Sequence, residues 1–164
     1  MRPGRGSARD RLLDLIAAAE AGRAGYDAVQ HGAHIPPPGP PTTLTIAQIY
    51  AWIDATPGMP HAIGRYQFIP PTLRRLVRIV GLSPQTRFTP RVQDRLAERL
   101  LIEAGIERFE AGTLSREAFM LGLAKIWAGL PTANGRSYYH GYAGNKATLS
   151  RARFEAEMAA IFPP

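Results

Sequence analysis

Helical periodicity covers most of the chain after Thr45, and residues that start helices recur along it. Each periodic segment repeats apolar residues every three or four positions and follows a capping residue or a proline suited to the first helical turn. The predicted helices run over about 45–55, 70–81, 89–105 and 115–127, and from Thr148 or Ser150 to about Ile161. This pattern predicts a mostly helical domain.

The segment before Thr45 has a different character. Arg9–Ala19 is strongly helical, whereas Gly25–Ile35 alternates partly and is broken by glycines, which favours a short β-hairpin. The proline run Pro36–Pro41 then prevents regular structure, and we interpret it as a rigid loop within one domain. The predicted fold class is therefore α+β, mostly helical, with one small β-hairpin lobe.

The length of 164 residues suits one domain with a sizeable core. We expect a single domain over residues 1–164, with a core over about 9–162 and a flexible basic N-terminus over 1–8. Cysteine is absent, so neither a disulfide framework nor a thiolate metal site is available. We expect the domain to act as a monomer.

The formal net charge is +7, from 20 Lys and Arg against 13 Asp and Glu. A positive field attracts polyanions, which include nucleic acids, anionic membranes and the acidic polymers of cell walls. No basic recognition helix and no RNA-binding aromatic signature is present, so we expect no specific nucleic-acid partner. No apolar run approaches the roughly eighteen residues of a membrane helix, so we expect no membrane insertion.

The N-terminus imitates a signal peptide, because Arg2 and Arg5 precede LLDLIAAAEA. Asp14 interrupts this apolar stretch, which is also short for the hydrophobic region of a signal peptide. We interpret it as an amphipathic helix, and we expect that it is not a signal peptide.

Glu20 lies at an unusual place for a carboxylate. It follows the predicted helix Arg9–Ala19 and precedes Gly22, a residue typical of a helix end in the left-handed conformation. The unpaired carbonyls of a helix C-terminus disfavour a negative charge, and desolvation would raise the pKa of the carboxyl further. Glu20 is therefore a candidate acid that protonates a leaving group near neutral pH. The alternative is a solvated glutamate offset by Arg23.

Two loops carry side chains suited to a neutral polar ligand. In AIGRYQFIPPTL, residues 62–73, Tyr66 and Gln67 offer a phenol and an amide that can bind hydroxyl and N-acetyl groups. The alternative for this loop is an ordinary turn whose Tyr66 packs into the core. The second loop follows Trp127, which we expect in the core, and its candidate ligand contacts are Tyr138, Tyr139 and Tyr142.

His31 and His34 stand three positions apart and raise the question of a metal site. Neither Cys nor an HExxH pattern accompanies them, and the prolines that follow prevent a helix. A P-loop, a dinucleotide fingerprint and a GxSxG elbow are absent as well. We therefore expect no metal and no cofactor.

The order of these motifs resembles that of the lambda-phage-type lysozymes, lytic transglycosylases of the lysozyme superfamily. That family has a helix that delivers the acid, then GYD, then GRYQ before a helix, then IWASLP before a loop with Tyr and Gly. The corresponding positions in this chain are Glu20 with Gly22, GYD at 25–27, GRYQ at 64–67 and IWAGLP at 126–131. FTPRVQDRLA, residues 88–97, is similar to the family's Gln-Asp helix. The resemblance covers about residues 12–146 and implies a lysozyme-like domain.

Two departures accompany the resemblance. Gly129 stands where the family usually has Ser, and Gln30-His31-Gly32 with the proline run replaces an Asp- and Tyr-rich hairpin. We therefore expect the hairpin arm that closes over the sugar to be shorter or stiffer here.

The resemblance implies a muramidase of the endolysin kind, which cleaves the β-1,4 bond between N-acetylmuramic acid and N-acetylglucosamine in bacterial peptidoglycan. Glu20 would protonate the bridging oxygen and then act as base. The implied substrate-binding residues are Asp27, Tyr66, Gln67, Tyr138, Tyr139 and Tyr142. The enzyme would be synthesised in the bacterial cytoplasm without a signal peptide and would reach the cell wall by holin-type or particle-mediated delivery.

Two mechanisms and one non-enzymatic alternative stay open. A hydrolase needs a second carboxylate, for which Asp27 is the candidate, whereas a lytic transglycosylase uses the muramic acid 6-hydroxyl and forms a 1,6-anhydro ring. The family gives the Asp of GYD no nucleophilic role, and Asp27 could cap a turn. We favour the one-acid mechanism, with Gln67 and Tyr66 orienting the N-acetyl group or the Glu20 carboxyl. The rival is a non-catalytic glycan-binding or phage-particle structural module.

Overall fold

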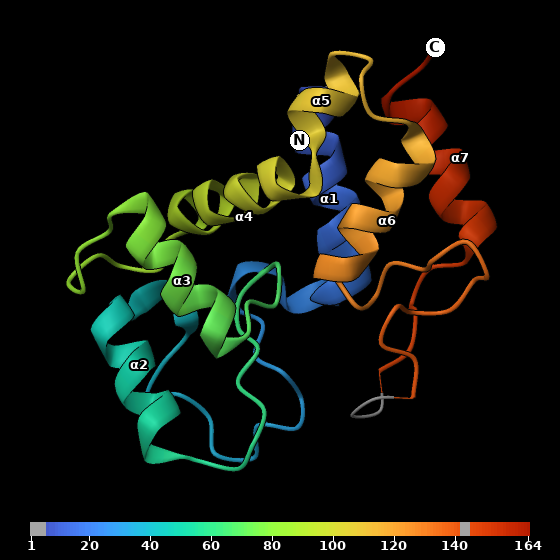
Figure 1. The fold of residues 1–164 in the computed structure, drawn as a ribbon. Coiled ribbons are helices and arrows are strands. Elements are labelled where there is room, and N and C mark those ends of the chain that lie inside the picture. Colours follow the sequence, from blue (N-terminus) through green and yellow to red (C-terminus); the bar gives the residue numbers. More distant parts are fainter. Residues whose placement is uncertain (1–5, 142–144) are drawn as a thin grey trace. The chain divides into compact units, whose positions relative to one another are not determined.

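The computed structural model describes residues 6–141 and 145–164, and the chain forms two compact units. The terminal unit combines the N-terminal segment up to Glu20 with Leu100–Pro164, and the middle unit is Ala21–Arg99. The described helices are α1 (Ala8–Glu20), η1 (Gly22–Asp27), η2 (Pro41–Thr43), α2 (Ile46–Ala55), α3 (Pro70–Val80), α4 (Pro90–Ala104), α5 (Ile106–Glu110), α6 (Arg116–Ile126) and α7 (Arg151–Ile161), where η marks a 3-10 helix (Figure 1).

Side-chain caps explain where several of these helices begin. Thr45 accepts a hydrogen bond from the backbone of Gln48 at 3.1 Å, and the Gln48 side chain accepts the Thr45 N–H at 2.8 Å. The Ser115 side chain accepts the backbone N–H of Ala118 at the start of α6, and Ser150, not Thr148, accepts that of Arg153 at the start of α7. These helix starts confirm the predictions from sequence.

Helix α5, Ile106–Glu110, is an element that the sequence analysis did not predict. It follows Gly105, whose φ of +103° separates it from α4. Its five residues are too few to show a helical period of apolar residues.

The structure does not confirm the β-hairpin expected over Gly25–Ile35. Gly22–Asp27 forms η1 instead, and Gly25 has a φ of +57°, a left-handed conformation that interrupts a strand. Val29 makes only an isolated antiparallel bridge, to Ile63. The prolines that follow lack the N–H groups that would extend such a ladder.

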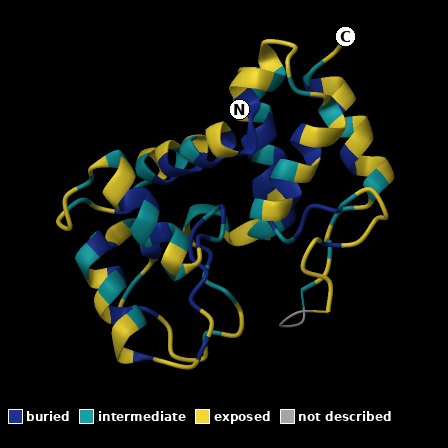
Figure 2. Cartoon of the chain, in the orientation of Figure 1, coloured by how far each residue is buried: buried dark blue, intermediate teal, exposed yellow. Residues whose placement is uncertain are grey.

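In the terminal unit, α1 packs against α7, and α5 packs against α6 (Figure 1). Figure 2 shows α1 largely in the colour of buried residues, which are Leu12, Leu13, Leu15, Ile16, Ala17 and Ala19. Phe109 stacks on Phe119 with 4.7 Å between ring centroids, and Phe162 meets both rings edge-on. The aromatic contacts join α5, α6 and the end of α7 into one packed cluster.

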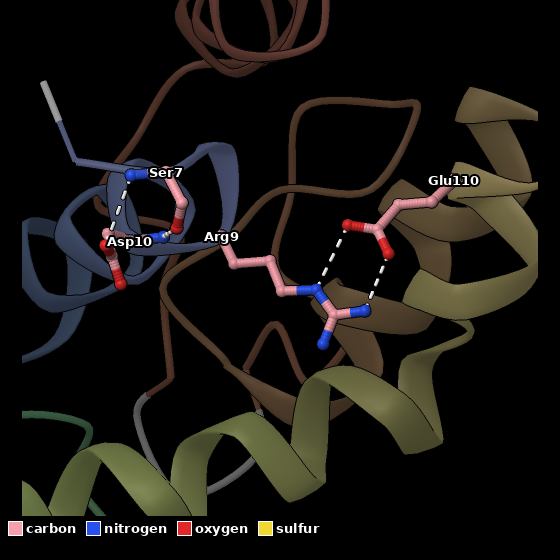
Figure 3. A network of polar contacts seen from close by, with 4 residues as sticks. All are labelled: Ser7, Arg9, Asp10 and Glu110. Atoms are coloured by element: carbon pink, nitrogen blue, oxygen red, sulfur yellow. Dashed lines mark hydrogen bonds and ion pairs between the residues drawn. The ribbon is translucent and has the colours of Figure 1, made fainter.

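Polar contacts fix the first turn of α1. The Ser7 and Asp10 side chains each accept a backbone N–H of the other residue, at 3.1 and 3.2 Å. Arg9 forms a two-pronged ion pair with Glu110, with N···O distances of 2.6 and 3.0 Å (Figure 3). The pair joins α1 to α5 and lowers the pKa of the Glu110 carboxyl.

The middle unit contains α2 and α3. Arg74 of α3 pairs with Asp54 of α2 at 2.9 Å and lies 4.3 Å above the ring of Tyr50. The buried apolar side chains of these two helices are Ile46, Ile49, Trp52, Leu73, Leu76 and Val77. In the part of the chain that the structure describes, no helix has both the length and the apolar character of a membrane span.

Candidate functional site

Glu20 ends α1, and the last turn of that helix contains no basic residue. Gly22 follows with a φ of +61°, so the chain leaves the helix at a left-handed glycine, as predicted. The last carbonyls of a helix point beyond its end and disfavour a negative charge there. The chain therefore places a carboxyl where its neutral form is favoured.

The Glu20 carboxyl is part-buried and receives a hydrogen bond from the backbone N–H of Gly129, with 3.1 Å between N and Oε1. Burial raises the pKa of Glu20 to about 7, and the Gly129 N–H opposes this by stabilising the charged form. At neutral pH the carboxyl is therefore divided between its acid and base forms. This is the condition of a group that donates and then recovers a proton.

Gly129 approaches the end of α1 more closely than a residue with a side chain could. A Cβ at this position would lie 2.8 Å from the Ala19 carbonyl oxygen and 3.0 Å from Thr148 Oγ1. Glycine therefore lets the backbone N–H reach the Glu20 carboxyl. This close approach explains why the chain has Gly at position 129, where the lambda-phage-type lysozymes usually have Ser.

In the middle unit, Asp94 accepts hydrogen bonds from two tyrosine hydroxyls. Tyr26 donates to its two oxygens at 2.9 and 3.1 Å, and Tyr66 donates to Oδ1 at 2.6 Å. The Arg65 guanidinium lies 5.1 Å from the Tyr26 ring centroid and 5.5 Å from that of Tyr66, and it donates to the Tyr66 hydroxyl at 2.8 Å. Burial and the bond to Asp94 raise the pKa of both tyrosines.

Gln93 joins the same motifs through their backbones. Its side chain is fully buried, accepts the Arg65 N–H at 2.9 Å and donates to the carbonyls of Tyr26 and Phe88 at 3.0 Å. A Cβ on Gly64 would lie 2.5 Å from Gln93 Oε1, so glycine is needed at the start of the GRYQ turn. The Gln-Asp helix therefore holds both the GYD and the GRYQ segments.

Two predicted ligand residues of the middle unit, Tyr66 and Gln67, differ in how far they are exposed. Tyr66 is 1% exposed, so its ring has no free face for a sugar, in agreement with the alternative of a core tyrosine. Gln67 is half-buried, adopts a φ of +49°, and donates from Nε2 to the Gly64 carbonyl at 2.9 Å. Such a conformation is rare for a residue with a side chain and is often retained for a function.

Asp27 caps a neighbouring segment. Its Oδ1 accepts the backbone N–H of Thr42 at 2.9 Å, which joins η1 to the 3-10 helix that follows the prolines. The carboxylate is thus engaged in the kind of turn capping that the sequence left open as an alternative.

Tyr138 and Tyr139 lie on the surface of the loop after α6, with 51% and 36% of their area exposed. Their rings meet edge-on at 5.0 Å, and the Lys125 ammonium lies 5.7 Å from the Tyr138 ring centroid. Tyr142 falls outside the described residues. Trp127 is 3% exposed and belongs to the core, as predicted.

The structure adds residues that sequence reasoning missed: Arg65, Gln93, Asp94 and Thr148. The similarity of FTPRVQDRLA to a Gln-Asp helix was the signal for Gln93 and Asp94. Thr148 gave no signal beyond its candidacy as a helix cap. Among the described residues, no group of three or more His, Cys, Asp or Glu side chains is arranged to hold a metal ion.

Comparison with known proteins identifies one protein family. A family model described as Endolysin matches residues 10–155. No curated protein and no solved structure matches the chain significantly.

Replacing Glu20 is expected to change how stability depends on pH. The folded-state pKa is raised from 4.5 to about 7, so the folded protein binds this proton more tightly than the unfolded chain does. The stabilisation is complete below about pH 4.5 and is lost as the pH rises to about 7. Glu20→Gln does not titrate, so the parent should lose about 3 kcal/mol relative to the variant across this window. Urea unfolding of both proteins at several pH values measures the difference, and a constant difference would contradict the raised pKa.

Removing Asp94 is expected to destabilise the protein far more than removing an exposed carboxylate. Asp94→Ala deprives the hydroxyls of Tyr26 and buried Tyr66 of their acceptor, which should cost about 2–3 kcal/mol. Asp54→Ala is the matched control, because its carboxylate is 71% exposed and its ion pair with Arg74 should contribute less than about 1 kcal/mol. Chemical denaturation compares the two variants with the parent. Equal losses of stability would show that Asp94 has no special structural role.

Proposed function

Because the chain belongs to the endolysin family, whose role is phage-encoded degradation of the bacterial cell wall, we propose that it is a peptidoglycan muramidase that uses Glu20 as its general acid. The observation that carries this proposal is a carboxyl whose pKa is raised to about 7 by burial and which touches a backbone N–H. The bond proposed to break is the β-1,4 bond between N-acetylmuramic acid and N-acetylglucosamine.

The hydrogen bond from Gly129 distinguishes the two oxygens of Glu20. An N–H donates to the carbonyl oxygen of a neutral carboxylic acid and not to its hydroxyl proton. Oε1 is therefore the carbonyl oxygen, and the transferable proton lies on Oε2. Oε2 gives this proton to the bridging oxygen as the glycosidic bond breaks and the sugar takes oxocarbenium character. The Gly129 N–H then stabilises the carboxylate that remains.

We favour a mechanism that uses one acid. The Asp27 carboxylate is engaged by the Thr42 N–H, which supports a structural role for it and not that of a nucleophile. In the proposed second step, the 6-hydroxyl of the same muramic acid attacks its own anomeric carbon. The Glu20 carboxylate accepts the proton of that hydroxyl, and a 1,6-anhydro ring forms without consumption of water. Glu20 is then protonated again.

Glycan contacts are proposed for exposed polar and aromatic side chains. Tyr138 and Tyr139 present amphipathic rings that suit the faces of sugars, and Tyr142 belongs to the same stretch of sequence. Gln67 offers an amide to an N-acetyl group, and exposed Asp27 is kept as a further contact. Tyr66 is buried, so its proposed role is to hold the loop that carries Gln67.

The proposed partner is peptidoglycan alone, without a cofactor. The positive charge of the chain supports attraction to the acidic polymers of the wall. We further propose that the protein acts as a monomer and reaches the wall by holin-type or particle-mediated delivery.

Glu20→Gln is expected to lower the rate of peptidoglycan cleavage by at least about a hundredfold, because general acid catalysis contributes that much or more. The control is Glu117→Gln, which changes an exposed glutamate in the first turn of α6 and should keep the parental rate.

Purified peptidoglycan is digested, and the masses of the products are measured. Anhydro ends, lighter than reducing ends by one water, are expected from the parent. Reducing ends would identify a hydrolase, and an active Glu20→Gln protein would exclude Glu20 as the acid. A parent that releases no products would favour the non-catalytic rival.

The pH dependence of the parent gives a separate test. The first step needs protonated Glu20, so kcat/KM should fall above about pH 7, the pKa to which burial raises this group. The measurement is the initial rate on solubilised glycan strands at low substrate concentration and constant ionic strength. A profile that stays level through the alkaline range would exclude Glu20 as the acid.

A further inference from the structure

We propose that Thr148 is a positioning residue that holds the Glu20 carboxyl and its N–H donor together. The proposal rests on the proposed function, because the role it assigns is in the same reaction. Thr148 lies between the loop after α6 and the start of α7, and it belongs to the terminal unit together with Glu20 and Gly129.

The first contact of Thr148 is with the end of the helix that carries the acid. Its hydroxyl donates to the carbonyl of Ala19, with 2.6 Å between the two oxygens. Carbonyls in the last turn of a helix have no partner within the helix, so a side-chain hydroxyl can satisfy one of them. Because Ala19 immediately precedes Glu20, this bond fixes the backbone from which the acid extends.

The second set of contacts is with the residue that donates to the acid. The backbone N–H of Thr148 donates to the Gly129 carbonyl at 3.0 Å, and Oγ1 lies 3.4 Å from the same oxygen. Gly129 in turn donates its N–H to Glu20 Oε1. Thr148 therefore binds both sides of the Glu20–Gly129 hydrogen bond, which are distant from each other in sequence.

The Thr148 hydroxyl occupies the space beside Gly129 that a side chain at position 129 would need. A Cβ on residue 129 would lie 3.0 Å from Oγ1 and 2.8 Å from the Ala19 oxygen that Oγ1 binds. The chain therefore combines a bare backbone at 129 with a hydroxyl delivered from position 148. The two features complement each other, and neither is explained by the capping of α7, since Ser150 performs that task.

The consequence for the reaction is orientation of the acid. A carboxyl at a helix terminus moves with the last turn, and the transferable proton is useful only when Oε2 points at the bridging oxygen. Loss of the Thr148 hydroxyl frees the Ala19 carbonyl and the Gly129 backbone to move independently. The expected defect is in the chemical step and not in the binding of glycan.

The test compares three substitutions at this position. Thr148→Val keeps the shape of the side chain and removes the hydroxyl, and kcat should fall about ten- to a hundredfold with KM nearly unchanged, as for a slightly misplaced catalytic group. Thr148→Ser restores the hydroxyl and should recover most of the parental kcat. Thr148→Ala tests the same loss without β-branching, should the valine variant fail to fold. Rates are measured on solubilised glycan strands at a temperature where circular dichroism shows all variants folded.

The matched control is Thr113→Val. Thr113 is also an exposed threonine whose hydroxyl donates to a helix-end carbonyl, that of Arg108 at 3.1 Å, and it should be replaceable without change in kcat. A parental kcat in Thr148→Val, an equal loss in Thr113→Val, or a serine variant as slow as the valine variant would each overturn the positioning role. Full activity of Glu20→Gln would instead overturn the proposed function, so the two failures are distinguishable.

Discussion

The chemistry proposed for this chain depends on one contact, the hydrogen bond from the Gly129 N–H to Glu20 Oε1. A carboxyl at the C-terminal end of a helix is disfavoured as an anion, and burial raises its pKa to about 7. The Gly129 N–H acts in the opposite direction, because it stabilises the anion and lowers the pKa of the carboxyl.

In the middle unit, hydrogen bonds from one helix hold two loop segments in place. Gln93 and Asp94 are consecutive residues of α4 that satisfy buried backbone and hydroxyl groups of the GYD and GRYQ segments. A loop with a left-handed residue such as Gln67 persists only when its surroundings hold it. The buried amide of Gln93 and the carboxylate of Asp94 supply that support.

The helices were largely predictable from sequence because their signals are local. Thr45, Ser115 and Ser150 cap helices through bonds to residues three positions on, and Gly22 and Gly81 end helices in left-handed conformations. The hairpin over 25–35 was not predictable in this way, because alternation of residues does not reveal whether a partner strand exists. Val29 finds its bridge at Ile63, far along the chain, and Gly25 turns the backbone away from a strand.

The features of the candidate site also separate into those set by neighbouring residues and those set by distant ones. The order of residues was enough to predict that an acid ends the first helix before a glycine, that Gly64 and Gln67 bound a turn, and that three tyrosines share a glycine-rich loop. Each of these predictions concerns residues that are neighbours in the chain. The folded structure was needed to show that buried Tyr66 donates to Asp94, that Gly129 donates to Glu20, and that Thr148 contacts both Ala19 and Gly129. Each of these depends on segments distant in the chain, whose approach is set by packing and by the need to satisfy buried polar groups.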